Sequence, residues 1–296
     1  MSVMKRIFLV VFTNILIMLA LGVIWTVLVA VFPSLGGMDN VSLAVLSLLW
    51  GFGGAIISLL LSKTLAKRMQ GVQVIDIDRA GPEERWLVST VHSLAREVGI
   101  TGMPEVGIWD SPEVNAFCTG PSKNSSLVAV STGILRRMNH DELEGVLAHE
   151  LSHAANGDMV TMTLVQGVVN SFVIFASFIL SRLLAGGNNR NRGGGFMEVM
   201  VRMVLQVALS TLAAVLIIYP FSRWREFRAD AGGARLAGKN KMIGALQALQ
   251  DSFRLPQGGP VAAPALATMK ISSDKRANLF STHPSLEERI EALNKL

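Results

Sequence analysis

The stretch GVLAHELSHAANGD, from Gly145 to Asp158, holds two of the five histidines in this chain of 296 residues. His149, Glu150 and His153 form the pattern H-E-x-x-H. In a helix, four residues at about 100° each bring the two imidazoles onto one face, roughly 40° apart. Neutral imidazoles suit Zn²⁺, and the adjacent carboxylate can take a proton from a metal-bound water. The spacing therefore indicates a helical metal site with hydrolytic chemistry.

The residues around this motif predict the helix that would carry it. Asn139 or Asp141 can cap its start, and Glu142 or Glu144 can complete a capping box. An apolar stripe follows at helical spacing, formed by Leu143, Leu147, Leu151 and Ala154. The alternative is a chance match on a surface helix, and the cap and the stripe argue against it.

The third ligand decides the class of metallopeptidase. A metzincin would need Gly at position 156 and His at 159, but the chain has Asn156 and Met159, which excludes that class. A gluzincin takes a carboxylate from a second helix, and Glu226 in SRWREFRAD is the candidate. Asp230, one turn later, could accept the outer N–H of a ligating imidazole and fix its tautomer. The alternative for Glu226 is a solvated acid in an arginine-rich helix beside a membrane.

The composition indicates a membrane protein. Half of the chain is hydrophobic and only 17% is charged, against about 25% in a typical soluble domain. Four stretches run roughly 20 residues or more without a charge, which is long enough to cross the hydrocarbon core of a bilayer. We therefore expect four transmembrane helices, at Ile7–Phe32, Val41–Ser62, Met159–Ser181 and Met203–Ser222.

The distribution of basic residues predicts the orientation of the first hairpin. Its connection, residues 33–40, carries no Lys or Arg, whereas its two ends carry Lys5, Arg6, Lys63, Lys67 and Arg68. The positive-inside rule places both ends in the cytoplasm. The first apolar run is too long for a signal peptide and lacks a small-residue cleavage site, so we expect a retained anchor.

The second hairpin returns the chain to the side that it left. The helices bearing His153 and Glu226 should therefore emerge at one membrane face. Arg190 and Arg192, however, lie in the loop that would have to be outside. Whether this hairpin spans the bilayer fully or is re-entrant stays open at this point.

The predicted organisation has four parts: a transmembrane hairpin (1–62), a catalytic region (63–158), a second hairpin (159–222) and a C-terminal catalytic region (223–296). A helix should run from Pro82 to about Val98, because Pro82 suits a first helical position and Gly99 an end. The runs MPEVGIWD, NAFCTG and SSLVAVSTG predict a small antiparallel β-meander. The fold class is thus a mainly α membrane protein with an α+β, gluzincin-like catalytic domain on four transmembrane helices.

The C-terminal region should contain three helices and a loop. Helices are expected at 226–238 and 241–254, followed by a loop at 255–270. A closing helix should have Pro284 at its first position. The single cysteine, Cys118, excludes an intrachain disulfide and fits a reducing compartment. The net charge of +5 is clustered beside membrane segments, which indicates contact with anionic lipid and not with nucleic acid.

Four motifs in sequence order carry a resemblance: PEVNAFCTG, AHELSHAANGD, EFRAD and STHPSLEERI. With the two hairpins, they resemble the HtpX family of membrane zinc metalloproteases, distant relatives of the CAAX prenyl proteases, over essentially the whole chain. The resemblance implies that His149, His153 and Glu226 hold one zinc ion and that Glu150 is the general base. It also implies that the enzyme cleaves misfolded or damaged membrane proteins at the cytoplasmic face of a bacterial inner membrane.

Other residues have two interpretations each. An exposed strand edge at Asn115, Ala116 and Phe117 could pair with an extended substrate through main-chain hydrogen bonds, or Phe117 could lie in the core. His283 could donate a hydrogen bond to the oxyanion of the tetrahedral intermediate. Alternatively, Thr282 or His283 caps the closing helix. Arg289 could pair with Asp230 or Glu226.

Two rival functions remain. A site-two-type intramembrane protease would hold zinc inside the bilayer, but the helix from Asp141 to Asp158 carries too many charges to be a span. A non-proteolytic, zinc-stabilised membrane scaffold would use the same ligands, although it would have no need of Glu150. The predicted partners are polypeptide substrates and the lipid bilayer, and the oligomeric state is left open.

Overall fold

The computed structural model describes residues 40–184, 196–254 and 283–296. The predicted span Ile7–Phe32, the loop with Arg190 and Arg192, and the loop 255–270 lie outside these residues. The chain divides into two compact units. The described parts of the first, here the helical unit, are 40–56, 164–184 and 196–217. Those of the second, here the mixed unit, are 57–163, 218–254 and 283–296.

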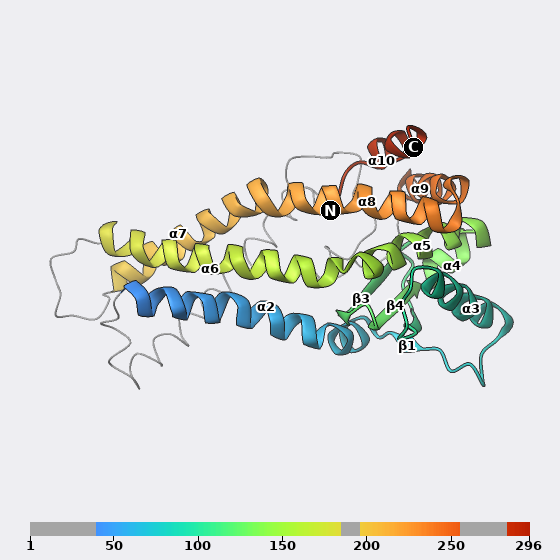
Figure 1. Ribbon diagram of the computed structural model, residues 1–296, viewed down its shortest axis with the longest axis horizontal. Helices are drawn as coiled ribbons and strands as arrows, with labels where there is room; N and C mark the ends of the chain where they lie inside the picture. Colours follow the sequence, from blue (N-terminus) through green and yellow to red (C-terminus); the bar gives the residue numbers. More distant parts are fainter. Residues whose placement is uncertain (1–39, 185–195, 255–282) are drawn as a thin grey trace. The chain divides into compact units, whose positions relative to one another are not determined.

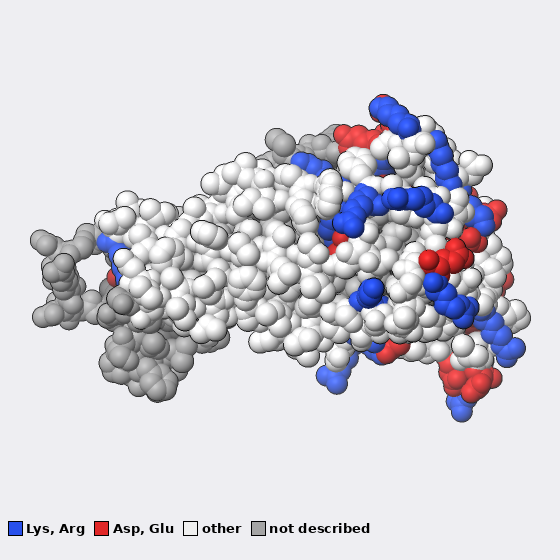
Figure 2. Space-filling view, in the orientation of Figure 1, with Lys and Arg blue, Asp and Glu red and all other residues white. Residues whose placement is uncertain are grey.

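Long apolar helices form the helical unit (Figure 1). They are α2 (Asn40–Gln70), α6 (Asp158–Leu184) and α7 (Phe196–Ala213), and a π-helical turn (Ala214–Ile218) joins α7 to α8 (Tyr219–Ala237). In the described residues, three helical segments are long and apolar enough to cross a membrane: Asn40–Gln70, Asp158–Leu184 and Met197–Ala237. These segments contain three of the four predicted spans. Figure 2 shows the charged side chains gathered over the elements of the mixed unit.

Small residues allow α2 and α6 to pack closely within the helical unit. A Cβ added at Gly51 would collide with Ser171, and a Cβ added at Gly167 would collide with the ring of Phe52. Close backbone approach through small residues is how helices associate in a bilayer, where burial of apolar surface gives no advantage over lipid.

The mixed unit contains a four-stranded sheet, and its topology corrects the predicted antiparallel meander. The strands β1 (Gln73–Val74), β2 (Glu105–Trp109), β3 (Ala116–Ser122) and β4 (Ser125–Ser131) lie in the order β1-β2-β4-β3. β3 and β4 form an antiparallel hairpin, but β2 pairs with β4 in parallel. Six consecutive residues of β4 are buried. Such a strand takes a central place in the sheet, which leaves β3 at an edge.

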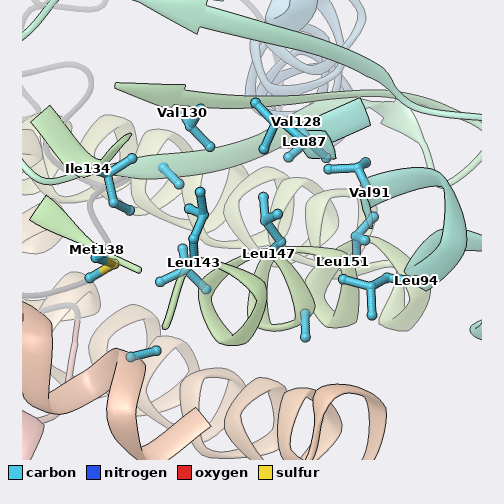
Figure 3. Close-up of a cluster of buried hydrophobic side chains, with 14 of the residues drawn as sticks. Leu87, Val91, Leu94, Val128, Val130, Ile134, Met138, Leu143, Leu147 and Leu151 are labelled. Carbon is cyan, nitrogen blue, oxygen red and sulfur yellow. The ribbon is translucent and has the colours of Figure 1, made fainter. Parts of the chain in front are cut away.

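The core of the mixed unit lies between this sheet and helices α3 (Pro82–Glu97) and α5 (His140–Asn156) (Figure 3). Leucines of α5 point toward Val128 and Val130 of β4 and toward the leucines of α3. The stripe of Leu143, Leu147, Leu151 and Ala154 is fully buried, as predicted. Helix α5 also contacts α8 and α9 (Lys239–Arg254), so it occupies the centre of the unit.

The helix ends follow local hydrogen bonding. The Asn139 side chain accepts the N–H of Glu142, and the Glu142 carboxylate accepts the N–H of Asn139, so Asn139 is the cap of α5. The closing helix, α10 (Leu286–Asn294), is capped by Ser285 through the same reciprocal pattern with Glu288. Pro284 therefore precedes the cap. The prediction that Pro284 is the first residue of the helix was therefore wrong, and so was capping by Thr282 or His283. The S-x-x-E pattern of Ser285 and Glu288 supplies the better cap.

Candidate metal centre

Helices α5 and α8 bring three potential ligands together inside the mixed unit. His149 and His153 lie on α5, and their Nε2 atoms are 3.2 Å apart. From α8, Glu226 places Oε1 3.4 Å from Nε2 of His153 and Oε2 3.5 Å from Nε2 of His149. One ligand atom from each residue lies within 4.8 Å of the others, so the group could hold one metal ion.

Two glycines of α8 permit this close crossing. A Cβ at Gly233 would lie 3.1 Å from the backbone nitrogen of His149, and a Cβ at Gly232 would lie 2.7 Å from Oγ of Ser152. The segment between Asp230 and Ala234 therefore packs its backbone directly against α5. This contact places Glu226 opposite the histidine pair.

Each imidazole has its own carboxylate partner at Nδ1. His149 Nδ1 lies 2.9 Å from Oδ1 of Asp230, and His153 Nδ1 lies 2.6 Å from Oδ2 of Asp158. A carboxylate at Nδ1 favours the tautomer that carries its proton there, which leaves Nε2 as the acceptor. Both Nε2 atoms face Glu226.

A fully buried arginine from α10 completes the cluster. Arg289 donates from Nε to Oδ2 of Asp230 at 2.8 Å and from Nη2 to Oδ1 at 2.6 Å. Its Nη1 lies 3.7 Å from Oε2 of Glu226. The bidentate pair holds the carboxylate of Asp230 in one orientation and partly neutralises the acids of the site. Of the two pairings considered from the sequence, the hydrogen-bonded one is with Asp230.

Glu150 points from α5 toward strand β3. Its Oε2 accepts the backbone N–H of Cys118 at 2.9 Å, and its side chain is buried. Burial raises the pKa of Glu150 above its ordinary value. A carboxylate with a raised pKa, beside two imidazoles, is suited to accept a proton and to return it.

The electrostatics of the cluster favour a cation. Burial lowers the pKa of His153, but Glu226 and Asp158 outweigh burial and raise it to about 9. Burial likewise lowers the pKa of His149, and Asp230 and Glu226 reverse that effect. The acids thus favour positive charge at both rings. Two imidazole nitrogens and one carboxylate are also a ligand set that fits Zn²⁺, so the residues present suit this ion.

His283 lies beside the third candidate ligand. It is buried, and its Nδ1 is 3.1 Å from Oε2 of Glu226. The structure therefore brings His283 into the cluster, whereas its role as an oxyanion donor stays a prediction. His92 and His140 lie elsewhere: His92 Nε2 contacts the carbonyl of Pro104, and His140 stacks on Trp86.

Asn115 directly precedes the edge strand β3, which begins with Ala116 and Phe117 and packs against α5. Both main-chain polar groups of Asn115 bond to Ser131, so they face β4. The side chains of Ala116 and Phe117 are buried, and the ring of Phe117 packs against Trp109. Phe117 is therefore a core residue. Because main-chain direction alternates along a strand, the groups at the outer edge of β3 belong to Ala116 and Cys118.

Two groups of the candidate site had no strong sequence signal. Asp158 directly follows Gly157, which ends α5. An acidic residue at this place is also common at the start of a helix, here α6. The N–H of Cys118 is a backbone group, and only its register in β3 brings it to Glu150.

Comparison with known proteins matches residues 82–296 to Peptidase family M48. The chain is 47% identical to "Protease HtpX homolog" of Bacillus subtilis (strain 168), over 98% of both chains, and 49% identical to "Protease HtpX" of Shewanella loihica, over 98% of this chain and 99% of the relative. The crystal structure of S. mikatae Ste24p superposes with a TM-score of 0.65 at 20% identity, covering 92% of this chain and 62% of that one. This last likeness concerns the fold.

Proposed function

Since the chain belongs to peptidase family M48 and is a membrane metalloprotease, we propose that it is a zinc-dependent endopeptidase. Each chain would bind one Zn²⁺. His149, His153 and Glu226 would hold the ion. The observation that carries the proposal is the convergence of these three ligand atoms within 4.8 Å. When bound, Zn²⁺ would polarise the scissile carbonyl and acidify a water molecule.

Glu150 acts as the general base in this proposal. It takes a proton from the attacking water and later passes that proton to the leaving amine. One carboxyl group can thus act first as the general base and then as the general acid. The N–H of Cys118 holds the carboxylate of Glu150 in place, since it donates to Oε2 at 2.9 Å. Asp230 supports His149 by holding the proton at Nδ1, and Arg289 holds Asp230.

The substrate would bind in extended form along β3. Addition of a strand to a free sheet edge uses main-chain hydrogen bonds, so it tolerates many side chains. The main-chain groups offered to the substrate would be those of Ala116 and the carbonyl of Cys118, because the N–H of Cys118 donates to Glu150. Asn115 and Phe117 would hold the strand in place from its other edge. His283 would donate a hydrogen bond to the oxyanion, a contribution worth typically about 10²–10³ in rate.

We propose that the substrates are misfolded or damaged membrane proteins, cleaved at the cytoplasmic face of a bacterial inner membrane. The basic ends of the first hairpin support a cytoplasmic mixed unit. The composition of α5 supports a site outside the hydrocarbon core, because this ligand helix carries Asp141, Glu142 and Glu144 in addition to the motif. That composition disfavours an intramembrane, site-two-type protease.

The decisive experiment is digestion of an unfolded polypeptide, such as casein, by the full chain purified in detergent. We expect cleavage that a zinc chelator abolishes and added Zn²⁺ restores. A scaffold that only binds clients would retain zinc without cleaving them. Cleavage that persists after complete removal of zinc would contradict the proposed site.

A further inference from the structure

The junction between α5 and α6 places a carboxylate next to the metal site. Helix α5 ends at Gly157, whose φ of 70° lies in the left-handed region that glycine adopts without strain. Helix α6 begins at the next residue, Asp158. The sharp turn folds the first residue of α6 back toward the last turn of α5, where His153 lies.

The resulting contact is short and buried. Oδ2 of Asp158 lies 2.6 Å from Nδ1 of His153, and Asp158 is only 3% exposed. On the other side of the ring, Nε2 of His153 faces Glu226 at 3.4 Å. The imidazole is therefore held between two carboxylates, and its plane stands nearly perpendicular to that of His149, at 86°.

We propose that Asp158 is the positioning residue of His153. It would orient the His153 ring in the same way that Asp230 orients the ring of His149. The inference rests on the proposed zinc site. By accepting the Nδ1 proton, Asp158 keeps Nε2 unprotonated and aimed at Glu226, so it raises the affinity of the histidine for a metal. Because Asp158 is also the first residue of a helix long and apolar enough to span a membrane, it ties one ligand to the start of that helix.

The competing explanation is that Asp158 only stabilises the start of α6. Acidic residues are favourable there because of the helix dipole, and Asp, Asn and Ser all suit a helix start. These residues differ in what they offer His153. Asn keeps an acceptor oxygen but loses the charge, whereas Ser is too short to reach the ring.

The test is a zinc titration of the purified full chain in detergent, by competition with a chromophoric chelator. We expect Asp158→Ser to lower zinc affinity about 10–100-fold and Asp158→Asn to lower it less. The thermal midpoint of the zinc-free protein should fall to a similar extent in both, because both variants remove the buried charge beside the His153 ring. The absorption spectrum of the Co²⁺-substituted protein should change with Asp158→Ser, and the exposed Asp78→Asn serves as a control that should match the wild type.

Zinc affinities of both variants within twofold of the wild type would overturn the inference, as would a loss of zinc affinity that is equal in Asp158→Ser and Asp158→Asn. A wild-type chain that binds no zinc would instead contradict the proposed function. The two failures are thus distinguishable.

Discussion

At the scale of single residues, the site combines three ligand candidates with groups that act on them. Glu150 differs from the other acids of the cluster, because it accepts a backbone N–H from β3 instead of pairing with an imidazole nitrogen. Asp230 and Asp158 each face an Nδ1 atom. These different partners are the physical basis for assigning proton transfer to Glu150 and positioning to the two aspartates.

Replacing Glu150 by glutamine should separate metal binding from turnover. The amide oxygen can still accept the N–H of Cys118, but it cannot take a proton from water. We expect Glu150→Gln to retain zinc and to cleave casein at least about 10²-fold more slowly. Glu144→Gln, on the same helix but paired with Lys241, is the matched control and should cleave normally. Undiminished cleavage by pure Glu150→Gln would refute the assignment of the base.

Removing the buried guanidinium should mainly affect stability. Arg289→Met leaves Asp230 without its bidentate partner in a buried site, so we expect a loss of about 3–5 kcal/mol in the free energy of unfolding of the zinc-free protein. Urea titration followed by tryptophan fluorescence would measure it. The double variant Arg289→Met, Asp230→Leu should recover part of this stability, but not zinc affinity. A single variant as stable as the wild type would show that the ion pair is not required.

At the scale of elements, the crossing of α5 and α8 determines the site. Glu226 reaches the histidines only because α8 presents Gly232 and Gly233 to the backbone of α5. The edge strand β3 is the second determinant, since its register brings the N–H of Cys118 to Glu150. Neither relation is local in sequence.

A larger side chain at the crossing should separate the ligands. Gly233→Val would push against the backbone of His149 and the sulfur of Met242, so we expect zinc affinity to fall at least about tenfold. Gly244→Ala on α9 is the control, because its Cβ would make only an ordinary 3.8 Å contact with Glu142. Equal zinc affinity of the two variants in a titration would contradict the proposed role of the crossing.

At the scale of the whole molecule, polarity separates the two units. The apolar helices carry large exposed hydrophobic side chains, such as Phe172 and Leu183, which suit a lipid surface. The mixed unit carries most of the charged side chains (Figure 2) and all members of the candidate site. The chain is therefore a membrane protein whose candidate site lies in the mixed unit.

The proposed orientation can be tested by labelling single cysteines in a background in which Cys118 is replaced by serine. We expect Asp78→Cys in the mixed unit to react with a membrane-impermeant maleimide only after the cells are permeabilised. Gly36→Cys, in the connection 33–40, should react in intact spheroplasts. The reverse pattern would place the mixed unit outside the cytoplasm.

The sequence by itself determined the local features. The structure confirms the spacing of His149 and His153, the buried stripe of α5 and three helices long and apolar enough to span a membrane. These features were predictable because helical periodicity and length act over neighbouring residues. The need of a gluzincin for a carboxylate from a second helix also extended the prediction to Glu226, which lies far along the chain.

Only the tertiary structure decided which distant segments meet. The parallel pairing of β2 with β4, the bond from the N–H of Cys118 to Glu150 and the contact of Arg289 with Asp230 depend on packing between elements. Even the neighbouring Asp158 needed the left-handed turn at Gly157 to reach His153. Such contacts are set by burial and shape over the whole unit, so no local pattern of residues specifies them.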